Sequence, residues 1–227
     1  MNYFIIPARS GSKGVPNKNV ILLNGIHLLG YSIKTASASR HTNQIILSTD
    51  SDEYIEIAKI YGNVISIKRN KLTSNDKAKD IDYMLHTIFQ LELDEFDNLI
   101  ILRPTSPIRK IEVVDKAIEI FNTISYDFDA LRSMHVLPEA PEKMFRLNSD
   151  NSVKPLFGDD IDITNQPRQM FEESYHPNGY VDIVSVRSIM QTKKSFGNKI
   201  YGYITERIYE IDTVEDIDFL NIKMKGI

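Results

Sequence analysis

The amino-acid sequence predicts an α/β protein, a three-layer α/β/α sandwich around a predominantly parallel sheet. In the first half of the chain, short apolar runs alternate with segments of helical periodicity, which is typical of a parallel sheet with helices on both faces. The length of 227 residues suits one such domain. With 42% hydrophobic and 26% charged residues, the chain has enough apolar residues for a packed core. We therefore expect a single domain over residues 1–227.

The predicted elements follow one another in a regular order. Four runs rich in Ile, Val and Leu have the length of buried strands: 3–6, 44–48, 64–67 and 98–102. Three segments carry apolar residues at helical spacing: 54–61, 81–89 and 114–121. Two more strands are expected at 180–186 and 199–204, and a terminal helix opens at Thr213 with Asp216 as a capping-box-like partner. Ligands of such sheets bind beyond the carboxyl ends of the strands, here in the loops after Ile6, Ser48 and Leu102.

The stretch from about 127 to 175 has a different character. It contains four prolines, interspersed charges and little periodicity. We interpret it as an insertion of loops and short strands, which serves as a lid or a small dimerisation arm. It is not expected to form an independent domain.

Composition excludes several classes of protein. With 31 acidic and 27 basic residues the net charge is −4, so no nucleic-acid partner is expected. The absence of cysteine excludes disulfides and a thiol nucleophile, and suits a cytoplasmic protein. No run of 18 apolar residues is present and the apolar start is cut short by Pro7, so we expect no membrane span and no secretory signal.

The strongest local signal lies directly after the first predicted strand. Small residues alternate with three cations there: Arg9, Lys13 and Lys18. Gly11 and Gly14 let backbone N–H groups converge on an anion, because no Cβ blocks the approach. The run matches neither a P-loop nor the dinucleotide fingerprint. A solvated turn is the alternative, but three cations within ten residues favour a polyphosphate-binding loop.

The run from Ile6 to Asn19 closely resembles the first signature of the CMP-sialic acid synthetases, the acylneuraminate cytidylyltransferases. Further matches follow in order along almost the whole chain: Ser48-Thr49-Asp50, Pro104-Thr105-Ser106-Pro107-Ile108-Arg109, Arg168-Gln169, Asn178-Gly179 and Ile211-Asp212-Thr213. The resemblance implies a Rossmann-like sheet of the nucleotide-diphospho-sugar transferase type. It also implies a homodimer, in which the arm of one subunit borders the active site of the other.

The activity implied by the resemblance is transfer of CMP from CTP to the anomeric hydroxyl of a sialic acid-like nonulosonic acid, with release of pyrophosphate and with Mg²⁺ as cofactor. The implied nucleotide-binding residues are Ala8, Arg9, Ser12, Lys13, Asn19 and Arg69, and the implied catalytic residues are Arg9, Lys18 and Asp212. Asp212 and Glu210 are the implied metal ligands, and alternation in an extended segment puts both on one side. Glu210 stands where the family has aspartate. Asp212 has an alternative role at the N-terminus of the last helix.

The implied sugar-binding residues are Arg103, Lys143, Arg168, Gln169, Asn178 and Asp182. Arg168 suits the sugar carboxylate through a bidentate contact. Several residues depart from the family pattern: Arg103 replaces Gln, Asp182 replaces Tyr, Asp80 replaces Ser, and His176-Pro177 replaces Arg-x. We hypothesise that the acceptor is a modified relative of N-acetylneuraminate, and that Asp182 meets a positively charged or amide-donating substituent. Asp80 either accepts from the cytosine amino group or is an exposed helix charge.

Two other functional hypotheses are compatible with these residues. One is CMP transfer to an eight-carbon 3-deoxy-octulosonate or its amino derivative. The other is a non-catalytic nucleotide-binding protein on the same scaffold, in which Arg103 and Glu210 mark lost chemistry. Retention of Arg9, Lys18 and Asp212 together argues against the second.

Overall fold

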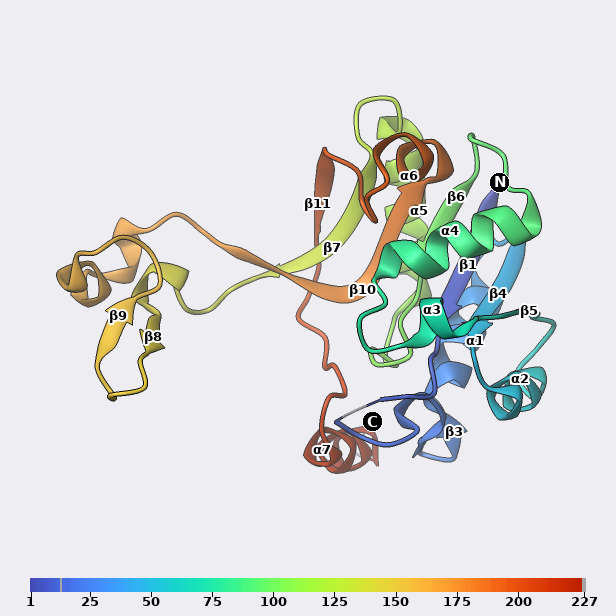
Figure 1. Ribbon diagram of the computed structural model, residues 1–227, viewed down its shortest axis with the longest axis horizontal. Helices are drawn as coiled ribbons and strands as arrows, with labels where there is room; N and C mark the ends of the chain where they lie inside the picture. Colours follow the sequence, from blue (N-terminus) through green and yellow to red (C-terminus); the bar gives the residue numbers. More distant parts are fainter. Residues whose placement is uncertain (13, 226–227) are drawn as a thin grey trace.

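The computed structural model describes residues 1–12 and 14–225, with the side chain of residue 225 left out. Its centre is a seven-stranded sheet in the order β11-β7-β10-β6-β1-β4-β5 (Figure 1). The strands are β1 (Asn2–Pro7), β4 (Gln44–Thr49), β5 (Ile65–Lys68), β6 (Asn98–Ile101), β7 (Ala130–Val136), β10 (Tyr175–Ser185) and β11 (Ile200–Ile204). Only β10 runs antiparallel to its neighbours, β6 and β7. The predicted α/β fold with a mostly parallel sheet is therefore confirmed.

Helices cover both faces of the sheet because successive strand residues point in opposite directions. Phe4 and Ile6 of β1 pack in one cluster with α1 (Leu28–Ala38), α2 (Asp52–Lys59) and α5 (Ile111–Ile124). Ile5 packs in the opposite cluster with α4 (Asp80–Leu91) and α6 (Val186–Thr192). Strands apolar on both sides are what this arrangement requires. In the part of the chain that the structure describes, no helix has the length and apolar character needed to cross a bilayer.

The last helix, α7 (Val214–Lys225), begins where the sequence predicts. The Asp216 carboxylate accepts from the backbone N–H of Thr213 at 2.8 Å, and the Thr213 hydroxyl accepts from the N–H of Asp216 at 3.3 Å. This reciprocal pair is a capping box. Because Asp216 caps the helix, the carboxylate of Asp212 is free for another role.

Helix α1, which was not predicted from the sequence, follows a short hairpin of β2 (Leu22–Leu23) and β3 (Ile26–His27). Small and polar residues interrupt the apolar periodicity of this helix. One of them, Gly30, is required by packing: a Cβ there would lie 2.6 Å from the Tyr61 ring. The missing side chain thus lets the loop after α2 pack against α1.

The insertion predicted over 127–175 begins too early, because β7 is a strand of the main sheet and pairs with β10 and β11. Polar side chains along β7, such as Arg132 and His135, hide its strand character from the sequence. The chain between β7 and β10 forms an arm that projects away from the sheet (Figure 1). It carries β8 (Phe145–Leu147), β9 (Val153–Pro155) and the 3₁₀ turns η2 (Pro141–Lys143), η3 (Ile161–Asn165) and η4 (Arg168–Met170).

Candidate active site

The predicted phosphate loop leaves the carboxyl end of β1 and is attached to the end of β4. The backbone N–H of Ala8 donates to the carbonyl of Ser48 at 2.9 Å. Both the N–H and the hydroxyl of Ser10 donate to the Asp50 carboxylate at 2.8 Å. The loop then turns through η1 (Lys18–Val20), where the Asn19 amide donates to the carbonyl of Arg9 at 2.9 Å. These bonds hold the loop over the end of the sheet.

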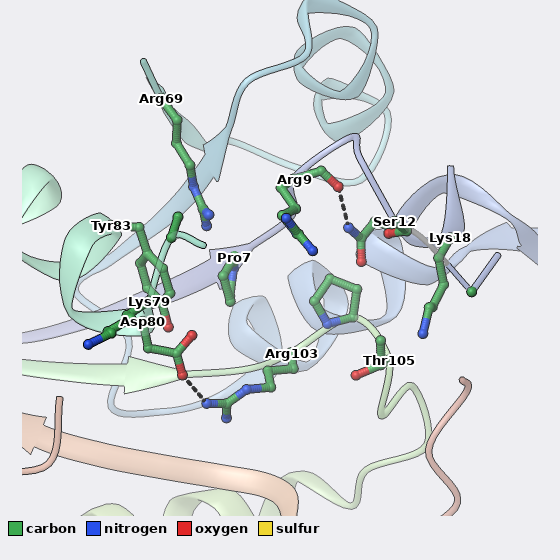
Figure 2. A pocket seen from close by; sticks show the side chains of 14 residues that line it. Pro7, Arg9, Ser12, Lys18, Arg69, Lys79, Asp80, Tyr83, Arg103 and Thr105 are labelled. Carbon is green, nitrogen blue, oxygen red and sulfur yellow. Dashed lines mark hydrogen bonds and ion pairs between the residues drawn. The ribbon is translucent and has the colours of Figure 1, made fainter. Parts of the chain in front are cut away.

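A cavity of about 330 Å³ lies beneath this loop, and we call it the first cavity (Figure 2). Its walls include five of the predicted nucleotide-binding and catalytic residues: Arg9, Ser12, Lys18, Asn19 and Arg69. The wall is completed by Pro7, Gly14, Ala78, Lys79, Asp80, Tyr83, Arg103, Pro104 and Thr105. Ala8 is buried next to it, and Lys13 lies outside the described residues. The structure thus brings together loops that are far apart in the sequence.

The first cavity has two chemically different ends. Figure 2 shows Arg69, Tyr83 and Asp80 on one side, and Ser12 and Lys18 on the other. Between them, the Arg9 guanidinium donates to the Asn75 carbonyl and to Asp76, each at 3.1 Å. The loop after α3 (Lys71–Ser74) is thereby held near the cavity.

Arg69 is buried, and its Nε donates to the Ser48 hydroxyl at 2.8 Å. The guanidinium lies over the Tyr83 ring, 4.5 Å from the centroid, which is a cation–π contact. Burial lowers the pKa of Arg69 and raises the pKa of Tyr83. Tyr83 was not expected as a site residue, because it lies within the helix predicted over 81–89 and no motif in the sequence singles it out.

Lys18 connects the first cavity to a second one. Its ammonium donates to the Asp212 carboxylate at 2.9 Å and to the Ile211 carbonyl at 3.0 Å. Asp212 in turn lines a cavity of about 250 Å³, which we call the second cavity. The other residues in its wall are His135, His176, Pro177, Asn178, Arg207, Ile208, Tyr209, Glu210 and Asp216. Two of the three predicted catalytic residues, Lys18 and Asp212, therefore form an ion pair between the two cavities.

Glu210 and Asp212 both line the second cavity. Burial and the neighbouring Asp212 raise the pKa of Glu210. Glu210 also packs closely on Gly179, where φ is +62° and a Cβ would lie 2.8 Å from the Glu210 carboxylate. Carboxylates are the side chains that Mg²⁺ prefers beside phosphate and water, so the chemistry of this pair suits the ion. Among the residues that the structure describes, no third His, Cys, Asp or Glu joins them in a ready-made metal cluster.

Three of the departures from the family pattern contact one another. Arg103 donates to Asp182 at 2.5 Å and to Asp80 at 2.8 Å. The second oxygen of Asp182 accepts from Arg132 Nε at 3.3 Å. Asp182 is fully buried and raises the pKa of Arg103. We call these four residues the Arg103 network.

This network corrects the hypothesis for Asp182. Both of its carboxylate oxygens already pair with arginines inside the protein, and it lines neither cavity. It therefore does not present a free charge to a sugar substituent. Asp80, in contrast, is not merely an exposed helix charge, because it lines the first cavity.

The remaining predicted sugar-binding residues fall into two groups. Asn178 lines the second cavity, but its amide donates to Thr205 at 2.7 Å and to the Glu206 carbonyl at 3.2 Å. Lys143, Arg168 and Gln169 lie on the arm and line neither the first nor the second cavity. Arg168 donates to the Leu137 carbonyl at 3.3 Å. One chain alone does not bring these arm residues to its own site.

Two histidines in the second cavity were missed or left without a role. Residues 135 and 176 face each other in the register of β7 and β10, and the ring centroids are 5.8 Å apart. Burial, His176 and Arg207 lower the pKa of His135. The sequence marks His176 as a departure from the family pattern. That His135 lies beside it follows only from the pairing of β7 with β10.

The sequence profile of a family described as cytidylyltransferase matches residues 3–210. An N-acylneuraminate cytidylyltransferase from Escherichia coli O18:K1:H7 is 31% identical over 95% of this chain, and this chain spans 49% of that protein, about half its length. Two relatives match over nearly their whole length. A CMP-N,N'-diacetyllegionaminic acid synthase from Legionella pneumophila is 30% identical, with 95% of this chain and 91% of that protein covered. A pseudaminic acid cytidylyltransferase from Campylobacter jejuni is 29% identical, with 99% and 96% covered.

Among solved structures, the fold is similar to that of a CMP:2-keto-3-deoxy-manno-octonic acid synthetase complexed with CTP. The TM-score is 0.73 with 15% sequence identity, over 99% of this chain and 98% of that one. At this identity the likeness concerns the fold alone. By the profile match over most of its length, the chain belongs to the cytidylyltransferase family.

Proposed function

We propose that this protein transfers CMP from CTP to the anomeric hydroxyl of a nonulosonic acid and releases pyrophosphate. The observation that carries the proposal is the Lys18–Asp212 ion pair, because Lys18 lines the first cavity and Asp212 the second. A transferase needs two substrate sites that meet at the reacting atoms. The nucleotide occupies the first cavity and the sugar acid the second, so that the α-phosphorus lies beside Lys18.

Positive charge is required to bring an anionic triphosphate and a carboxylate sugar together. Arg9, Ser12 and Lys18 offer donors along the phosphate end of the first cavity. Asp212 and Glu210 are the residues that would hold Mg²⁺, which supplies positive charge for the phosphate oxygens when bound. In the same proposal, Asn19 binds the nucleotide through its side chain or through the Arg9 backbone that it holds.

The acceptor in this proposal is a modified nonulosonic acid rather than plain N-acetylneuraminate. The support comes from two relatives that match this chain over nearly their whole length and are named for legionaminic and pseudaminic acid. The second cavity supplies Arg207 and the His135–His176 pair for an anionic group. Polar contacts of this kind discriminate strongly between acceptors, because an unpaired buried group is costly.

A homodimer would bring the arm to the site of a second copy. The arm exposes large apolar side chains, among them Leu147 at 69% and Met170 at 72%, which suits burial against another chain. Lys143, Arg168 and Gln169 would then reach the partner's sugar, with Arg168 on its carboxylate. Light scattering tests this part of the proposal, and a strictly monomeric active protein would contradict it.

Pyrophosphate release with CTP and a panel of acids tests the activity. The panel contains N-acetylneuraminate, legionaminic and pseudaminic acids, and 3-deoxy-manno-octulosonate. We expect release with Mg²⁺ and a modified nonulosonic acid, loss of release after chelation, and recovery when Mg²⁺ is added back. Preference for N-acetylneuraminate or the eight-carbon acid would overturn the acceptor assignment. CTP binding without release for any acid would instead favour a non-catalytic nucleotide-binding protein.

A further inference from the structure

A buried guanidinium nitrogen lies at the end of the first cavity that is away from Lys18. Arg69 Nη2 is buried and receives no hydrogen-bond partner among the residues that the structure describes. Its Nε and the Tyr83 ring hold the guanidinium in place. A buried donor without a partner is costly unless a ligand completes it.

An acceptor lies across the same end of the cavity. One oxygen of the Asp80 carboxylate accepts from Arg103 at 2.8 Å, and Arg103 is itself held by the buried Asp182. Figure 2 shows the other Asp80 oxygen pointing away from Arg103, on the side of Tyr83. The Asp80 side chain is 40% exposed and lines the first cavity. The Arg103 network thus orients the Asp80 carboxylate through one oxygen and leaves the other oxygen to accept a hydrogen bond from a ligand.

Cytosine and uracil differ in what they offer to such a pair. The cytosine edge presents acceptors at O2 and N3 and a donor at the 4-amino group, whereas uracil carries an acceptor at O4. Arginine can only donate and an ionised carboxylate can only accept. Arg69 and Asp80 together therefore complement cytosine, and Asp80 would face uracil O4 as one acceptor against another.

We propose that Asp80 selects the cytosine base, by accepting from its 4-amino group while Arg69 donates to O2 or N3. The proposal rests on the proposed function, in which CTP is the donor nucleotide. The role assigned to Arg103 changes with it: Arg103 is a positioning residue for Asp80 rather than a sugar ligand. The family resemblance does not supply this contact, because relatives often carry serine at position 80.

Asp80→Asn tests the proposal, because an asparagine amide can either donate or accept at the same place. We expect the ratio of kcat/KM for CTP to that for UTP, measured by pyrophosphate release with the best acid of the panel, to fall at least tenfold. Asp82→Asn is the matched control: it removes the same charge two residues along the same helix, where the carboxylate accepts from Lys79 N–H and lies outside the cavity wall. Its CTP/UTP ratio should stay within about twofold of the wild type.

A second variant and a second measurement separate the possible failures. Asp80→Ser should lose selectivity in the same direction, and titration of CMP and UMP into each folded variant reads base preference without turnover. An unchanged preference in both variants would overturn the proposal for Asp80. If the wild type prefers CMP to UMP but releases no pyrophosphate with any acid, the proposed transferase activity is wrong. The base preference of the variants then still tests the role of Asp80.

Discussion

Replacement of Lys18 by methionine should lower kcat for pyrophosphate release by about 100-fold or more, while CTP affinity stays within about tenfold of the wild type. The Lys18 side chain is only 12% exposed, and its ammonium bonds to Asp212 and to the Ile211 carbonyl. These bonds use two of its three donors within the described protein, which leaves the third for a phosphoryl oxygen. A positive charge beside the phosphoryl group stabilises the negative charge that develops there in the transition state. Its loss therefore lowers kcat more than it weakens CTP binding.

Lys110→Met provides the matched control for this experiment. Lys110 is 67% exposed and pairs with Glu206 on the surface, outside both cavities. Its loss should leave kcat near the wild-type value. A Lys18→Met enzyme that retains kcat within about fivefold would contradict a transition-state role for Lys18.

Asp182→Asn should lower the free energy of unfolding by about 3–5 kcal/mol, because it breaks a buried charge cluster from one side. Asp182 is fully buried and separates Arg103 from Arg132. An asparagine oxygen can accept from one of the two guanidiniums but does not offset their charge. Urea denaturation measures the change in the free energy of unfolding. An equal dependence of that free energy on urea concentration in wild type and variant checks the two-state analysis.

Asp159→Asn serves as the control, since Asp159 is an exposed residue of the arm and its loss should change stability by no more than about 0.5 kcal/mol. A double-mutant cycle with Arg103→Gln then isolates the pair. Once Arg103 is removed, Asp182→Asn should cost clearly less than it does alone. Equal costs in both backgrounds would mean that the contact between Arg103 and Asp182 does not stabilise the protein.

Much of the fold follows from local patterns in the sequence. Short apolar runs identify the strands β1, β4 and β6. The capping pair Thr213 and Asp216 identifies the start of α7. Several elements were not predicted, among them α1, α6 and β7. Small residues such as Gly30 blur the periodicity of α1, and polar residues such as Arg132 blur the alternation of β7.

The phosphate loop is also local, and a resemblance to a signature identifies most of its residues. The residues that depart from the family pattern are far apart in the sequence, so their contacts cannot be predicted from local patterns. Asp80 begins α4, Arg103 lies in the loop after β6, and Arg132 and Asp182 lie on β7 and β10. Only the tertiary fold brings these four residues together. Taken singly, Asp182 resembled an unpaired charge for a substrate, whereas in the fold it is the buried partner of two arginines.

In the proposed function, the loop after β1 holds the phosphates of CTP. Calorimetric titration of CTP into the wild type and into an Arg9→Met, Lys18→Met double variant tests it most directly. We expect saturable one-to-one binding to the wild type, and an affinity weaker by about two orders of magnitude or more in the folded double variant. A wild type that does not bind CTP, or a double variant that binds it equally well, would contradict the account.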